Sequence, residues 1–122
     1  MHFCWVTLPV KDLEASLAFY HGLLGLPIAS RHSGHGTEMA MLGEKDQPKI
    51  ELICLPGGQE EALHSGMTVG VATESLDSAM ELLQKQRIPI ARGPVSPAPH
   101  VRFLFVRDPD GYEVQLVEMK KA

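Results

Sequence analysis

The chain has 122 residues, which suits one domain or two small modules that share a core. Apolar residues make up 44% and charged residues 21% of the chain, an ordinary globular composition that argues against disorder. The net charge of −4 leaves no basic stripe to neutralise phosphates, so we expect no nucleic-acid partner. No apolar run approaches the roughly 18 residues of a membrane-spanning helix. We therefore expect a cytoplasmic protein with no membrane partner.

The two cysteines limit the covalent and metal chemistry of the chain. Cys4 and Cys54 are too few for a disulfide scaffold or for a four-thiolate zinc site. We expect both to be small buried side chains in a reducing compartment.

The first half of the chain begins with a strand and a helix. Alternation puts Leu8 and Val10 on one face of the strand and Trp5 on the other. Asp12 is a candidate helix N-cap, and Gly25 marks the end of the helix. The apolar stripe between them has helical spacing and consists of Leu13, Leu17, Tyr20 and Leu24. Two further strands are predicted at 38–42 and 49–55.

The second half repeats this order of elements. A strand at 67–73 precedes Ser75, a second candidate N-cap, and a helical stripe follows it. The closing strands are predicted at 101–107 and 112–118. The sequence Asp108-Pro109-Asp110-Gly111 joins them and has the composition of a tight turn.

The two halves align with each other along the chain. Ser75 follows Asp12 by 63 positions. The segment Ile50-Glu51-Leu52-Ile53 aligns with Val114-Gln115-Leu116-Val117 at nearly the same spacing. This period predicts an α+β protein of two βαβββ modules that pair to bury a joint core. We place module one at 1–58, a linker at 59–65 and module two at 66–122, within one domain.

Four stretches of the chain, residues 10–20, 23–26, 50–53 and 108–111, resemble the vicinal oxygen chelate superfamily. This group includes glyoxalase I, bleomycin-resistance proteins and extradiol dioxygenases. The resemblance implies paired βαβββ modules whose curled mixed sheets enclose a cup, within a homodimer. It leaves the chemistry open, because one fold carries many functions.

The resemblance also implies four metal-ligand positions inside the cup. Glyoxalase I has His, Glu, His and Glu there, and this chain has Trp5, Glu51, Thr68 and Gln115. An indole offers no lone pair, and hydroxyl and carboxamide oxygens are weak neutral ligands for Zn²⁺ or Ni²⁺. We therefore expect a degenerate metal site and no cofactor. The alternative is a weakly bound divalent metal.

Each of these four residues has a functional and a structural interpretation. Trp5 either stacks on a flat or apolar ligand or fills space between the modules. Glu51 is either a general base or polar anchor, or a strand carboxylate that faces water. Thr68 and Gln115 contact ligand or only pack and hydrogen-bond.

Outside these positions, histidines and one arginine are candidates for ligand contact. His100 and Arg102 follow the Pro-rich run 93–99, an extended, loop-like segment suited to the rim of the cup. His32 and His35 lie in a Gly-containing segment that we interpret as a solvated loop. The sequence does not establish whether these two histidines bind anything.

We predict a small-molecule-binding protein that holds an organic ligand in an apolar cup. The alternative is a glyoxalase I-like lyase or isomerase, of lactoylglutathione lyase type, that uses Glu51 with a rearranged or absent divalent metal. A third possibility is a structural dimer without a ligand. The sequence identifies no particular ligand or substrate.

Overall fold

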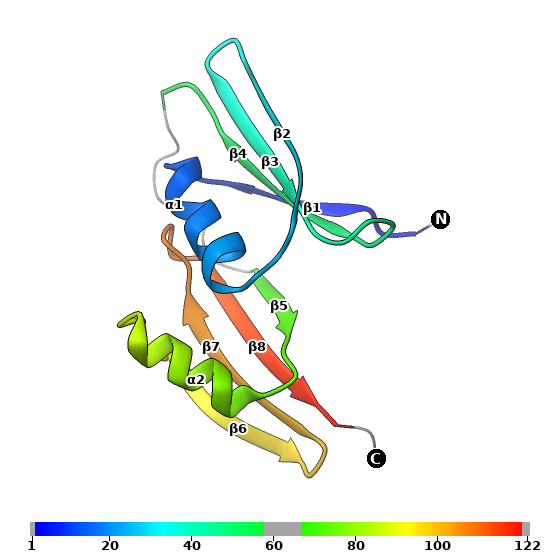
Figure 1. Cartoon of the computed structure of the whole chain (residues 1–122), viewed down its shortest axis with the longest axis vertical. Helices are drawn as coiled ribbons and strands as arrows, with labels where there is room; N and C mark the ends of the chain where they lie inside the picture. Colours follow the sequence, from blue (N-terminus) through cyan, green and yellow to red (C-terminus); the bar gives the residue numbers. More distant parts are fainter. Residues whose placement is uncertain (1, 58–66, 121–122) are drawn as a thin grey trace. The chain divides into compact units, whose positions relative to one another are not determined.

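The computed structural model describes residues 2–57 and 67–120. The chain divides into two compact units, Met1–Leu63 and His64–Ala122, and each is described by itself. Both have the order strand, helix and three strands, as Figure 1 shows. The prediction of an α+β protein with two βαβββ modules is therefore confirmed. The linker at 59–65 lies outside the described residues and stays a prediction, as does the shared cup.

Module one is a four-stranded mixed sheet in the order β1-β4-β3-β2. β1 and β4 are parallel, and the other neighbouring strands are antiparallel. Its elements are β1 (Trp5–Pro9), α1 (Leu13–Leu17), η1 (Ala18–Leu23), β2 (Ile28–Gly34), β3 (Thr37–Leu42) and β4 (Lys49–Cys54).

Module two repeats this topology in the order β5-β8-β7-β6. β5 and β8 are the parallel pair. Its elements are β5 (Thr68–Ala72), α2 (Leu76–Lys85), β6 (Arg92–Ala98), β7 (Val101–Arg107) and β8 (Glu113–Met119).

The core of each module lies between one face of its sheet and the helix. In module one, Leu8 and Leu52 on the sheet and Leu13 on the helix are almost fully buried. In module two, Leu104 and Leu76 have the corresponding roles. Burial of each such side chain contributes about 1.5–3 kcal/mol to folding. Strand residues of the opposite parity lie on the other side of the sheet, which we call the helix-free face.

Both predicted N-caps are confirmed. An Asp12 carboxylate oxygen accepts a hydrogen bond from the Ala15 amide at 3.2 Å, and the Ser75 hydroxyl accepts one from the Ser78 amide at 3.1 Å. These bonds satisfy amides that the first helical turn leaves without a partner. Each helix therefore starts where the sequence predicts.

The first helix differs from the uniform stripe that the sequence suggests. Its last six residues form the π-helix η1, in which the Leu24 amide reaches back to the Phe19 carbonyl at 3.0 Å. The wider turn lets Phe19 and Tyr20, which are adjacent in the sequence, both be buried. Their rings meet edge to face, with centroids 5.0 Å apart.

The segment with two histidines is a β-hairpin, which corrects its interpretation as a loop. His32 lies within β2 and pairs with Met39 of β3. His35 and Gly36 form the two-residue turn, with φ values of 54° and 79°. Positive φ at both positions is typical of a type I′ turn, which matches the twist of the flanking strands.

The Pro-rich run is also a strand rather than a loop. β6 covers most of it and pairs with β7 through two register irregularities. Proline is compatible with this position because β6 is an edge strand, where an amide on the outer side has no ladder partner to lose. The composition that suggested a loop therefore reflects an edge strand.

The expectation that both cysteines are buried is wrong. Cys4 is exposed and Cys54 is half-buried, and both are free thiols. Cys4 precedes β1, outside the alternation that buries Leu8. Cys54 lies at the end of β4, where its thiol donates to the Lys11 carbonyl at 3.3 Å.

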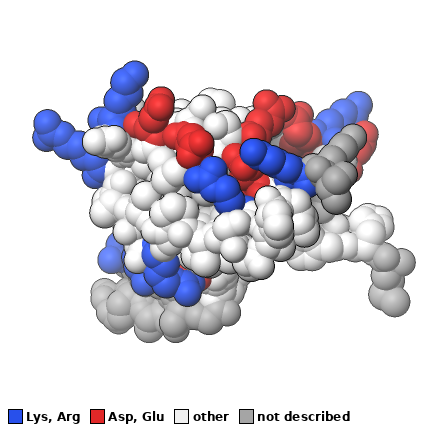
Figure 2. Space-filling model, turned by 90° about the horizontal axis from the view of Figure 1, so that it is seen from below, with Lys and Arg blue, Asp and Glu red and all other residues white. Residues whose placement is uncertain are grey.

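Acidic and basic side chains lie near one another along the upper part of the face in Figure 2, and much of the rest of this face is uncharged. Several charged side chains of the protein form ion pairs, such as Arg31 with Glu14 at 2.6 Å. Within the described ranges, no helix is both long and apolar enough to cross a membrane.

Candidate functional site

On the helix-free face of module one, a carboxylate and an indole lie on neighbouring strands. Thr7 of β1 is in register with Glu51 of β4, and its hydroxyl donates to Glu51 Oε1 at 2.7 Å. Trp5 lies two register positions earlier on the same face, opposite Lys49. Trp5 is 52% exposed, although it begins a strand whose later residues enter the core. The structure thus brings Trp5 and Glu51 to one face of one sheet.

On the helix-free face of module two, Thr68 and Gln115 also lie two register positions apart. Thr68 of β5 is opposite Glu113 of β8, and its hydroxyl donates to Glu113 Oε1 at 2.5 Å. Gln115 lies between Gly70 of β5 and Phe105 of β7. The hydroxyl at the implied metal-ligand position is therefore engaged by a carboxylate of its own sheet.

Glu113 is the centre of a charged cluster on this face. Arg92 Nη2 of β6 donates to Glu113 Oε2 at 2.6 Å, and the Arg92 guanidinium lies 3.9 Å from the centre of the Phe105 ring. The hydrogen bond from Thr68 lowers the pKa of Glu113, and the bond and charge of Arg92 and the charge of Arg107 lower it further. Glu113 is therefore ionised at neutral pH.

His100 lies at the opposite end of the sheet from this cluster. It is exposed in the β6–β7 turn, and its carbonyl accepts from the Lys120 amide at 2.8 Å. The neighbouring residue Val101 pairs with Met119, four positions along β8 from Gln115 and so about 13 Å away. A ligand contact by His100 stays a prediction.

Arg102 lies on the face that packs against the helix. Its guanidinium pairs with Asp77 of α2 at 3.1 Å, and its strand neighbour of the same parity, Leu104, is fully buried. Arg102 and Gln115 therefore lie on opposite faces of the sheet, Arg102 on the helix side and Gln115 on the helix-free face. Its predicted ligand contact has no support from this position.

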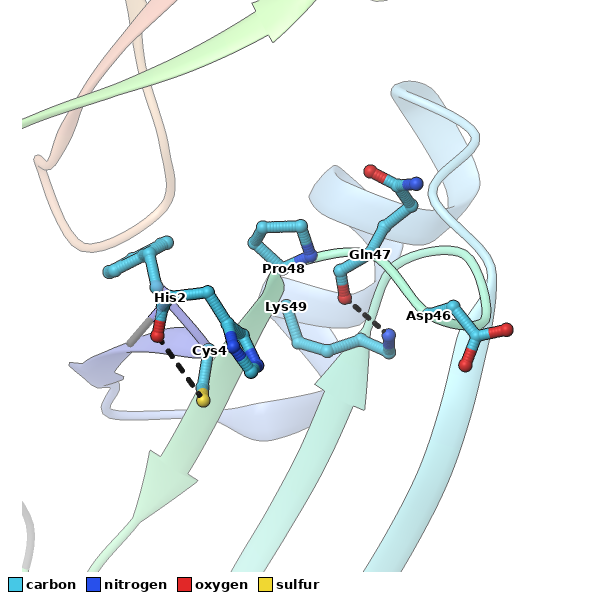
Figure 3. A pocket seen from close by; sticks show the side chains of 7 residues that line it. His2, Cys4, Asp46, Gln47, Pro48 and Lys49 are labelled. Atoms are coloured by element: carbon cyan, nitrogen blue, oxygen red, sulfur yellow. Dashed lines mark hydrogen bonds between the residues drawn. The ribbon is translucent and has the colours of Figure 1, made fainter.

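Two cavities lie elsewhere in module one. One of about 680 Å³ is lined by His2–Cys4, before β1, by residues 46–48 of the turn before β4, and by Lys49 at the start of β4 (Figure 3). In it, Lys49 Nζ donates to the Gln47 carbonyl at 2.6 Å. A second, of about 120 Å³, is lined by Arg31, His32, Ser33 and Glu38. None of the four implied ligand positions lines either cavity.

The residues at the four implied positions do not fit a transition metal. Trp5 offers no lone pair, Thr68 donates its proton to Glu113, and Gln115 is neutral. Glu51 is the one carboxylate, and one of its oxygens already accepts from Thr7. Within 2–57 and 67–120, no group of three or more His, Cys, Asp or Glu side chains is arranged to hold a metal.

Three residues of these faces escaped the sequence analysis. Thr7 and Glu113 have the same strand parity as Trp5 and Gln115, so the period of two could have revealed them. Arg92 could not be assigned to a sheet face from the sequence, because the prolines of β6 suggest a loop rather than a strand.

The chain resembles known proteins over nearly its whole length. Residues 2–116 match the model of the Glyoxalase/Bleomycin resistance protein/Dioxygenase superfamily. The chain is 31% identical over 132 aligned residues to the lactoylglutathione lyase of Salmonella typhimurium. The alignment covers all of this chain and 96% of that protein. It is 32% identical, with the same coverage, to the lactoylglutathione lyase of Escherichia coli O157:H7.

Solved structures share the fold at lower sequence identity. The trypanothione-dependent glyoxalase I of Leishmania major aligns with a TM-score of 0.83 at 22% identity, covering 97% of this chain and 86% of that one. TnmS3, an antibiotic binding protein from Streptomyces sp. CB03234, aligns with a TM-score of 0.74 at 21% identity, covering 98% and 97%. At these identities the likeness concerns the fold alone.

Proposed function

Because the chain belongs to the Glyoxalase/Bleomycin resistance protein/Dioxygenase superfamily, we propose that it binds a small organic molecule without a tightly held transition metal. Binding would use the helix-free faces of its sheets, on which the implied ligand positions lie. Such binding needs an apolar surface with a few polar anchors and no reactive centre.

The observation that carries this proposal is the position of Trp5. A half-exposed indole occupies the helix-free face of β1 where the family resemblance implies a metal-binding histidine. An exposed indole presents a broad apolar surface on which a flat ligand can stack, and its N–H can donate a hydrogen bond. These properties support organic binding better than metal binding.

Each module also has a polar anchor on its own helix-free face. Glu51 keeps one carboxylate oxygen that Thr7 does not occupy through its 2.7 Å bond, and it can accept from a ligand hydroxyl or amine. In module two, the amide of Gln115 can both donate and accept. Both side chains are half-buried, so their hydrogen bonds to a ligand would be partly shielded from water.

Trp5 also provides the test, because it is the only tryptophan of the chain. Its fluorescence should change on titration with some members of a library of aromatic and amphiphilic compounds. Replacement of Glu51 by Gln should weaken the binding of hydroxyl- or amine-bearing hits. The matched control is Glu38→Gln, since Glu38 is an exposed carboxylate on β3 of the opposite parity. An unresponsive Trp5 across the whole library would count against the proposal.

The metal state requires its own measurement. Elemental analysis of protein purified without chelators should find much less than one Ni or Zn per chain. About one tightly bound Ni or Zn per chain would contradict the proposal. The expectation comes from the donor set, in which only Glu51 is a charged ligand.

A second candidate function is a lactoylglutathione lyase-like reaction. The identity of 31–32% to two proteins of that name over nearly their whole length favours it, as does the presence of Glu51. In this case Glu51 would act as a general base, with its orientation fixed by the Thr7 hydroxyl.

Lactoylglutathione turnover separates the two candidates. The lyase hypothesis requires turnover, with or without added Zn²⁺ or Ni²⁺, that falls about 100-fold or more in Glu51→Gln and is unchanged in Glu38→Gln. Absence of turnover at every metal condition would remove this candidate and leave the binding function.

We propose a homodimer in the cytoplasm, as the family resemblance implies. Sedimentation equilibrium of the full chain would test the oligomeric state, and a monomer at micromolar concentration would contradict it.

A further inference from the structure

Four side-chain positions on the helix-free face of module two lie in one row across the sheet. Arg92 pairs with Phe105, Phe105 with Gln115, and Gln115 with Gly70. Neighbouring strands are about 4.8 Å apart, so the row is about 14 Å long. It presents, in order, a cation, an aromatic ring, an amide and a position without a side chain.

Arg92 is held in place but remains accessible. Its guanidinium lies over the Phe105 ring at 3.9 Å and donates through Nη2 to Glu113 at 2.6 Å, so two contacts orient its plane. Its side chain is still 60% exposed. A guanidinium has five N–H donors in a planar fork, which suits a carboxylate.

The charges around Arg92 favour an anion. Arg107 is in register with Glu113, and its guanidinium donates to the Gly111 carbonyl at 3.2 Å, so two arginines and one carboxylate share this end of the face. Glu113 therefore neutralises only one of the two arginines.

The other end of the row is open. A Cβ built on Gly70 would meet no atom within 4 Å, and the backbone there has no positive φ that requires glycine. The space above Gly70, beside Gln115, is therefore open. A flat apolar group can lie there with its polar edge near the Gln115 amide.

We infer that this row recognises a flat organic carboxylate, with the carboxylate at Arg92 and the apolar body over Phe105 toward Gly70. The inference rests on the proposed binding function and specifies its ligand class. On this inference, module two determines the preference of the protein for a negatively charged ligand.

The test compares two probes that differ in charge alone, 2-naphthoate and the neutral 2-naphthamide. In an NMR titration of the ¹⁵N-labelled full chain, naphthoate should bind at least about tenfold more tightly than naphthamide. Arg92→Gln should remove this preference and leave naphthamide binding unchanged. Gly70→Val should weaken both probes by filling the open space above Gly70.

The matched control is Arg31→Gln. Arg31 pairs with a carboxylate at the same 2.6 Å, but on the helix side of module one, so its loss should leave the naphthoate preference unchanged. If Arg92→Gln does not give a dispersed NMR spectrum, Arg92→Lys replaces it. Lys keeps the charge but lacks the planar fork, and the preference should fall several-fold.

Equal affinity for the two probes, or a preference that survives Arg92→Gln, would overturn this inference and leave the proposed function intact. Failure of naphthoate to bind would also overturn it, and the Trp5 library then decides the proposed function separately.

Discussion

The two modules each place a threonine–glutamate hydrogen bond on the helix-free face, but at different points along the strands. In module one the pair is Thr7–Glu51, and Trp5 begins the strand before it. In module two the pair is Thr68–Glu113, which corresponds in register to Trp5 and Lys49. Both carboxylates accept from a threonine hydroxyl, and the second also pairs with Arg92.

This offset shows how two modules of one strand topology can differ in the chemistry of the same face. A shift of two residues keeps a side chain on the same face of a strand, so a carboxylate can move along the sheet without entering the core. Module one thereby presents an indole with an anion, and module two an aromatic ring with an excess of cations. Two modules with the same topology therefore present different charges beside an aromatic side chain.

The helix side of the two modules differs as well. Glu118 in β8 accepts from the Leu76 amide at 2.8 Å, which adds a second cap to α2, and it is only 5% exposed. The aligned residue of module one is Cys54, whose thiol donates to the Lys11 carbonyl. A buried carboxylate is thus paired with a helix amide in one module, and a thiol with a loop carbonyl in the other.

The largest predicted effect comes from removal of this carboxylate. Glu118→Ala should lower the free energy of unfolding by about 2–3 kcal/mol, because a hydrogen bond to a buried charged group is lost. Cys54→Ala should cost less than about 1 kcal/mol, since a thiol is a weak donor. Urea unfolding measures both, and equal losses would contradict the comparison.

Removal of the N-caps should have a smaller effect on stability, and here the loss should be larger in module one than in module two. Asp12→Ala should destabilise the protein by about 1 kcal/mol, the usual cost of a lost cap. Ser75→Ala should cost less, because Glu118 still accepts from a first-turn amide of α2. Thermal or urea unfolding of the two variants would test this order, which a larger loss in Ser75→Ala would reverse.

The smallest effect concerns acid stability through Glu113. Its pKa is lowered in the folded state, so its hydrogen bonds stabilise the protein fully above the ordinary value of 4.5. That contribution is lost as the pH falls from 4.5 through the lowered pKa. The stability difference between the wild type and Glu113→Gln should therefore shrink over this range in urea unfolding. A constant difference would contradict the assignment.

The causes of this shift can be tested by titration. In ¹³C carboxyl NMR, Thr68→Val and Arg92→Gln should each raise the pKa of Glu113, because the Thr68 hydrogen bond and the bond and charge of Arg92 all lower it. Thr7→Val in module one is the matched control and should leave Glu113 unchanged.

The sequence predicted much of the fold because its patterns are local. Alternation identified the strands at 101–107 and 112–118 to within a residue, and short polar side chains marked both helix starts. The edge strands β2 and β6 were missed. Their residues are mostly exposed, so no alternation of buried and exposed side chains marks them.

The candidate site was less predictable from the sequence. Trp5, Glu51, Thr68 and Gln115 were found by family position and do lie on helix-free faces. The partners of Glu113 depend on register across three strands, which one-dimensional patterns do not contain. Arg102 shows the converse, because only the structure reveals its ion pair with α2.

The prolines of β6 also affect how the protein behaves in a crowded solution. Pro94 and Pro97 remove two amide donors from the outermost strand of module two, and Arg92 adds a charge at its start. An intact row of amides would offer a template for strands of other molecules. β6 lacks that continuity, which protects the module against edge-to-edge aggregation.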